Sequence, residues 1–131
     1  MGELAYFEYK KASAQGRPKE AEASIQKALK YDPKNSTYCL YASQLYLKKK
    51  EFAIARDFIE RALIEFNGDL TKWSVFYAQG LLNFQTGSLF EANEAFEKSL
   101  YYNPTFEAGR KKLEEVNKVI EDHDQIVIKI R

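Results

Sequence analysis

Apolar residues recur along this chain at intervals of three and four positions, which is the spacing of one face of an α-helix. One stretch places a small, a large and a second small residue at Ala92, Phe96 and Ser99, before a proline at Pro104. The same steps of four, three and five occur twice upstream. Those two copies are Ala21, Ile25, Ala28, Pro33 and Ala55, Ile59, Ala62, Asn67. A threefold recurrence of one spacing indicates an internal repeat.

Glycine and proline residues separate these helical patterns. Gly16 and Gly87 each follow an apolar pattern, at the position where glycine commonly ends a helix. Pro18 stands where a first helical turn begins, while Pro33 and Pro104 end the patterns that precede them. The sequence therefore predicts an all-α fold with helices over residues 3–15, 18–31, 36–49, 52–66, 70–86, 88–102 and 105–122.

The C-terminal segment breaks the helical pattern. Residues 126–131 read Ile-Val-Ile-Lys-Ile-Arg, a β-prone and apolar run. A lone strand is not stable in water. We therefore expect a β-prone tail over residues 123–131 that packs on the helices, pairs with another copy, or belongs to a longer parent chain.

The repeat resembles the tetratricopeptide repeat (TPR) family. Its first two copies are 34 residues apart, and the third has the residue types that the family prefers at Phe76, Gly80, Gly87, Leu89, Ala92, Phe96, Ser99 and Pro104. The resemblance implies a right-handed α-solenoid of three antiparallel helix pairs, with repeats at about 2–35, 36–69 and 70–106 and a capping helix at 105–122, together a domain of residues 1–122. It also implies that packing between helices rests on Ala21, Ala28, Ala55, Ala62, Gly80, Ala92, Phe96 and Pro104. The segments ARDFIERAL and KWSVFYAQ show a weaker resemblance to half-a-TPR (HAT) repeats, which occur in RNA-processing scaffolds.

Composition argues against several kinds of function. The formal net charge is +1, which is not the basic excess of a nucleic-acid-binding surface. The chain has one cysteine, Cys39, and one histidine, His123, too few for a transition-metal site of the usual nitrogen and sulfur type. It carries no Gly-rich phosphate loop and no catalytic triad pattern. We therefore expect no cofactor, no metal and no enzymatic activity.

The chain also shows no targeting or membrane signal. It lacks the charged start and apolar stretch of a signal peptide, and no apolar run approaches the roughly 20 residues of a membrane span. We expect a cytoplasmic protein without membrane insertion.

The TPR resemblance implies that the chain binds a protein or peptide on the concave face, which the first helix of each pair lines. Helical phase places aromatic, aliphatic and a few polar residues on that face: Tyr6, Lys10, Leu40, Tyr41, Gln44, Leu47, Tyr77, Leu81 and Phe84. Leu40, Leu81 and Phe84 fit a place in the core equally well. An exposed aromatic patch usually marks an interaction site, so we expect a groove for an apolar or amphipathic segment.

A subset of the family binds the acidic tails of heat-shock chaperones through a clamp of Lys, Asn, Asn, Lys and Arg. The matching positions here are Tyr6, Lys10, Tyr41, Ser74 and Ala78. Binding a free carboxylate needs convergent charged donors. We therefore predict that this chain is not a chaperone-tail clamp.

Three other readings remain open. The groove or the tail could bind another copy, the chain could be a regulatory fragment of a larger protein, or it could be a HAT-type RNA-processing scaffold.

The run Lys48-Lys49-Lys50 could form a basic contact, but it also suits a helix C-terminus, where lysine complements the helix dipole.

Overall fold

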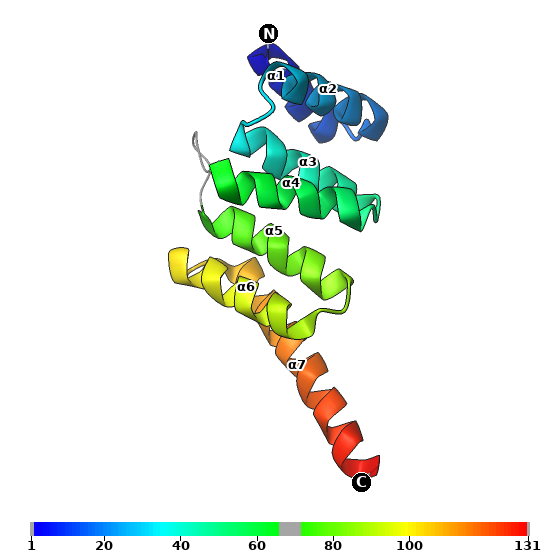
Figure 1. Ribbon diagram of the computed structural model, residues 1–131, viewed down its shortest axis with the longest axis vertical. Coiled ribbons are helices and arrows are strands. Elements are labelled where there is room, and N and C mark those ends of the chain that lie inside the picture. The colour runs from blue at the N-terminus through cyan, green and yellow to red at the C-terminus, as the bar shows by residue number, and fades with distance from the viewer. Residues whose placement is uncertain (1, 66–71, 131) are drawn as a thin grey trace. The chain divides into compact units, whose positions relative to one another are not determined.

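The computed structural model describes residues 2–65 and 72–130, and side chains except those of Glu65 and residues 127–130. In these residues the helices are joined by short turns, and there is no strand. The helices are α1 (Gly2–Ala14), α2 (Pro18–Tyr31), α3 (Ser36–Lys48), α4 (Phe52–Glu65), α5 (Lys72–Gln85), α6 (Leu89–Tyr102) and α7 (Glu107–Ile130) (Figure 1). The all-α fold class is thereby confirmed. Asn67 and the predicted helix start at residue 70 lie outside the described residues.

The first compact unit, Met1–Leu70, contains α1 to α4. Helices α1 and α2 form one hairpin, α3 and α4 form a second, and α2 packs on α3. Ala21, Ala28, Ala55 and Ala62 are all buried, with Ile25 and Ile59 buried between them. Small residues on both sides of a large one allow close helix packing, as the repeated spacing predicts.

The second compact unit, Thr71–Arg131, contains α5 to α7. Its core is formed by Ala92, Phe96 and Val116, which are fully buried. Gly80 on α5 lies so close to Phe96 on α6 that a Cβ atom at residue 80 would be 2.5 Å from the ring atom Cε1. Buried Ser99 donates a hydrogen bond from Oγ to the carbonyl of Trp73 at 2.9 Å. Pro104 is exposed and lies in the turn after α6, so it ends the helix but does not take part in packing.

Each hairpin turns through one residue with positive φ. Gly16 has φ 69° and Gly87 has φ 83°, the left-handed region in which glycine carries no steric penalty. Lys50 occupies the corresponding position in the second hairpin with φ 60°. The backbone N–H of Glu51 then donates to the carbonyl of Tyr46 at 2.9 Å, as that of Ser88 does to Asn83 at 2.8 Å.

Replacing Lys50 by glycine should therefore stabilise the protein. A non-glycine residue pays a steric cost in the left-handed region, and removing it outweighs the added freedom of the unfolded chain. We expect Lys50→Gly to raise the free energy of unfolding by about 0.5–1 kcal/mol, measured by urea denaturation followed by circular dichroism. Gly87→Ala is the matched control and should lower stability by about 1–2 kcal/mol. A loss of stability for both variants would contradict this account.

The C-terminal prediction is wrong. The backbone of α7 stays helical through Ile130, so residues 123–130 form no separate β-prone tail. Two physical reasons account for this. Extending an existing helix adds one hydrogen bond per residue and avoids the cost of nucleation, whereas β-branched residues cost only a few tenths of a kcal/mol each. A strand, by contrast, needs a partner strand, and the described residues form none.

Candidate functional site

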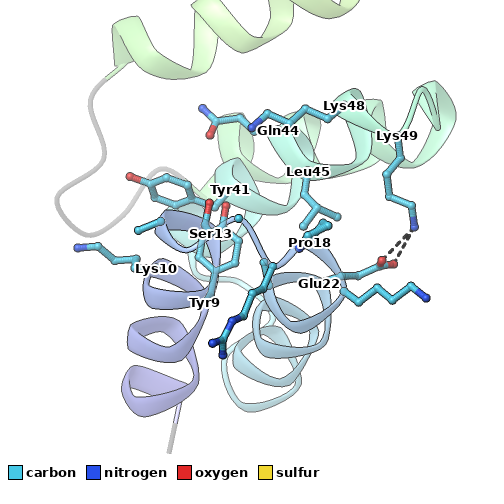
Figure 2. A pocket seen from close by; sticks show the side chains of 15 residues that line it. Tyr9, Lys10, Ser13, Pro18, Glu22, Tyr41, Gln44, Leu45, Lys48 and Lys49 are labelled. Carbon is cyan, nitrogen blue, oxygen red and sulfur yellow. Dashed lines mark hydrogen bonds and ion pairs between the residues drawn. The ribbon is translucent and has the colours of Figure 1, made fainter.

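An open pocket of about 730 Å³ lies on the first unit, between the hairpin of α1 and α2 and the face of α3. The end of α1, the turn at Gly16 and the start of α2 form one side, and α3 forms the other (Figure 2). This volume falls in the range of pockets that hold ligands. The turn at Gly16 brings the beginning of α2 back beside α1, which creates the concave surface.

The surface of the pocket is aromatic and aliphatic. Tyr9 from α1 and Ala21 from α2 are buried at its base. Leu45 extends from α3 toward Pro18, and Tyr41 lies beside Tyr9 (Figure 2). Because Pro18 and the alanines have no polar side-chain atoms, this surface can lose water to an apolar ligand at little cost.

The rim of the pocket is strongly basic. Five cations line it against a single carboxylate, Glu22, although the whole chain has a formal net charge of only +1. The cations are Lys10, Arg17, Lys19, Lys48 and Lys49. The pocket therefore concentrates positive charge that the rest of the chain balances with negative charge, and such a concave, single-sign surface attracts anionic ligands.

Two of these cations are already paired. Lys49 Nζ lies 3.0 Å from each oxygen of Glu22, and this hydrogen-bonded pair raises the pKa of the Lys49 ammonium. Arg17 lies 3.3 Å from Glu20. Among the described residues, Lys19 and Lys48 have no carboxylate within 4.0 Å, and Lys10 lies over the ring of Tyr6 at 5.5 Å. Lys10, Lys19 and Lys48 are thus the cations available to a ligand.

A cluster of four tyrosines stiffens the α1 and α3 sides of the pocket. Tyr6 and Tyr41 have ring centroids 5.6 Å apart, as do Tyr9 and Tyr41, and Tyr38 lies 5.1 Å from Tyr6. Burial, and then a hydrogen bond with Tyr41, raises the pKa of the Tyr6 phenol, and burial raises that of Tyr9. The raised pKa values keep Tyr6 and Tyr9 uncharged at neutral pH, and the four rings together form an aromatic wall.

The structure brings together three of the predicted groove residues. Lys10, Tyr41 and Gln44 line the pocket, and Tyr6 contacts it through the ring of Tyr41. Leu40 takes the core position that the sequence left open for it, whereas the expectation for Leu47 is corrected, because Leu47 is buried as well; neither residue lines the pocket.

The predicted groove residues of the second unit lie against the core of that unit. Tyr77, Leu81 and Phe84 are partly buried and pack against the core of Ala92, Phe96 and Val116. Leu113 and Ile120 of α7 pack against the same core. Leu81 and Phe84 thus take the core position that the sequence left open for them. Tyr77, predicted as a groove residue, packs against the same core.

Four basic pocket residues were not among the predicted site residues: Arg17, Lys19, Lys48 and Lys49. These residues lie in a turn and at helix ends, where helical periodicity does not predict the direction of a side chain. The run Lys48-Lys49-Lys50 could have indicated this basic surface. Helix α3 ends at Lys48, and the first two lysines of the run line the pocket.

Neither a cluster of metal ligands nor a reactive thiol is present among the described residues. No three of their His, Cys, Asp or Glu side chains are grouped to hold a metal ion. Cys39 is buried, and burial raises the pKa of its thiol to about 11, which keeps it protonated.

Of the helices described, none has the length and apolar character needed to span a membrane.

Comparisons with known proteins agree on one fold. The family model described as tetratricopeptide repeat matches residues 12–79. No curated protein matches the chain. Among solved structures, the first TPR of Spaghetti (RPAP3), bound to the HSP90 peptide SRMEEVD, has a TM-score of 0.82 at 20% identity, covering 92% of this chain and 93% of that one.

Two further structures extend this result. The Sgt2 TPR domain from Aspergillus fumigatus has a TM-score of 0.82 at 21% identity, covering 95% of this chain and 82% of that one. The second TPR domain of human RPAP3, in complex with the HSP70 peptide SGPTIEEVD, has a TM-score of 0.72 at 18% identity, covering 89% and 98%. These matches confirm the predicted solenoid fold of three helix pairs and a capping helix.

Proposed function

Because the chain belongs to the tetratricopeptide repeat family, we propose that it is a non-catalytic interaction module whose pocket on the first unit holds an amphipathic segment of a protein partner. The segment is a short helix with apolar residues on one face and carboxylates beside them. Scaffold or adaptor roles follow from such binding, and no cofactor takes part.

One observation carries this proposal: the pocket combines an apolar aromatic surface with a rim of available lysines. Tyr41 and Leu45 offer apolar contact, and tyrosine is a frequent anchor of protein interfaces. Lys10 and Lys48 stand on α1 and α3, so carboxylates on either side of an apolar stripe would meet a cation. An amphipathic helix lying in a groove is a common mode of peptide recognition.

The similar structures support peptide binding as such. Two of them hold peptides of heat-shock proteins, and both peptides end in Glu-Glu-Val-Asp. For this chain we propose a different ligand, because the positions that match the clamp carry Tyr6, Lys10, Tyr41, Ser74 and Ala78. Here side-chain carboxylates along a helix, and not a terminal carboxylate, meet the lysines.

The proposal is tested with synthetic peptides. The glutamate peptide is a short helical peptide with apolar residues spaced four, three and four positions apart and glutamates between them. The lysine peptide replaces every glutamate by lysine, and SRMEEVD serves as the third probe. By fluorescence anisotropy, the glutamate peptide should bind at least about tenfold more tightly than either of the others.

Pocket variants then locate the binding. Tyr41→Ala with Leu45→Ala, and separately Lys48→Glu on the surface, should each weaken glutamate-peptide binding at least about tenfold. The matched controls lie outside the pocket: Leu4→Ala with Tyr31→Ala, and Lys27→Glu. Equal binding of all three peptides, or equal affinity in pocket and control variants, would refute the proposed function.

A further inference from the structure

The end of α7 is a helix without a partner in its own unit. Leu113, Val116 and Ile120 pack against the core of the second unit. The side chains from Glu121 to Ile126 are all exposed, and the helix continues to Ile130. Figure 1 shows α7 extending beyond α6 in orange and red. This end adds about 15 Å of helix.

A second stripe on α7 alternates acidic and apolar residues. Glu115, Val119, Asp122 and Ile126 are spaced four, three and four positions apart, so they fall within about 60° around the helix axis. Val119 is 41% exposed and Ile126 is 57% exposed. At 100° per residue, this stripe lies about 120° around the helix from the one that packs on the core. Glu115 forms an exposed ion pair with Lys112 at 3.1 Å, and the apolar members of the stripe, Val119 and Ile126, are left exposed.

The charge of this segment is opposite to that of the pocket. Residues 113–126 contain five carboxylates, Glu114, Glu115, Glu121, Asp122 and Asp124, and one cation, Lys118. The pocket has five cations and one carboxylate. Opposite fields on two surfaces steer their encounter and favour one register of docking.

We propose that the free end of α7 from a second copy of this chain occupies the basic pocket of the first unit. The inference rests on the proposed function and names its partner. Val119 and Ile126 of that helix contact Tyr41 and Leu45, as the apolar residues of the bound segment do in the proposed function. Glu115 and Asp122 lie on the same stripe and meet the lysines of the rim.

The pairing joins a different surface from each of the two copies. Two copies can make the contact twice in a reciprocal dimer, or successive copies can close into a ring or extend as an open chain. In every case the mass in solution rises with protein concentration. It also falls with salt, because exposed charges are screened over about 8 Å at physiological ionic strength.

Sedimentation of the full chain tests the inference. Wild-type protein should associate, and Lys48→Glu in the pocket and Asp122→Lys on the stripe should each raise the dissociation constant at least about tenfold. Lys27→Glu and Glu121→Lys are matched controls of the same charge change, one outside the pocket and one off the stripe. Both controls should associate as wild type does.

Mixing the two variants provides the sharper measurement. The Lys48→Glu chain keeps an intact α7, and the Asp122→Lys chain keeps an intact pocket. Each alone should be a single chain at concentrations where their mixture forms one-to-one dimers. Restored association in the mixture supports the pairing of pocket with helix. Association of each variant alone with the affinity of the wild type overturns it.

Two outcomes separate this inference from the proposed function. A single-chain mass at every concentration, with the glutamate peptide still bound in the pocket, overturns the second copy as occupant and leaves the proposed function standing. A single-chain mass together with no peptide binding overturns both.

Discussion

Replacing Phe96 by alanine is expected to lower the free energy of unfolding by about 3–5 kcal/mol. Phe96 has 0% exposure and packs against two residues of α5, Gly80 and Tyr77, whose ring centroid is 5.7 Å away. Truncation removes the apolar contact and leaves a cavity that the rigid helix backbones cannot close. Urea denaturation followed by circular dichroism gives the change.

Phe90 supplies the control for this experiment. It lies on the same helix but is 73% exposed, so Phe90→Ala should change stability by less than about 0.5 kcal/mol. If Phe96→Ala and Phe90→Ala differ by less than about 1 kcal/mol, Phe96 does not fill the space between these helices as described.

The second large effect concerns the residue that faces this ring. An added Cβ at Gly80 would lie 2.5, 2.6 and 2.9 Å from three atoms of the Phe96 ring. Alanine favours a helix over glycine by about 1 kcal/mol, yet the clash should make Gly80→Ala destabilising by about 1–3 kcal/mol. The sign of the change therefore reports the close approach of α5 to α6.

A double-mutant cycle isolates the contact from the helix propensity. In the Phe96→Ala background the clash is gone, so Gly80→Ala should become neutral or stabilising by up to about 1 kcal/mol. Residues in contact show interaction energies of this kind, whereas distant residues add independently. Equal effects of Gly80→Ala in the two backgrounds would disprove a direct contact between residues 80 and 96.

The sequence predicted the packing of the helices well because a strict local rule governs it. A small residue is needed wherever two helices approach closely, and the repeat places one at the same step each time. Ala21, Ala55 and Ala92 are all buried as a result. Helix ends were equally predictable at Gly16 and Gly87, because only glycine enters the left-handed region without cost.

Lys50 and the end of α7 show where local rules fail. Lys50 adopts the left-handed conformation because the turn between α3 and α4 requires it, and no residue preference revealed this. Residues 126–130 prefer strands by composition, but extension of an existing helix decides their backbone. In both cases the neighbouring structure overrides the intrinsic preference of the residue.

The candidate site was predicted only in part. Helical phase identified Lys10, Tyr41 and Gln44, which lie on regular helix faces. It could not place Arg17, because a turn sets its direction. It also could not separate Tyr41 from Leu40, since adjacent residues lie only 100° apart around a helix and the boundary between core and surface depends on the neighbouring helix.

The central claim is that the basic pocket of the first unit holds an acidic amphipathic segment. It is tested most directly by titrating ¹⁵N-labelled protein with the unlabelled glutamate peptide and following the backbone amide signals. The account predicts saturable shifts at Lys10, Tyr41, Gln44 and Lys48, with the signals of α6 unchanged. Shifts that saturate on other surfaces while these four signals stay in place would contradict it.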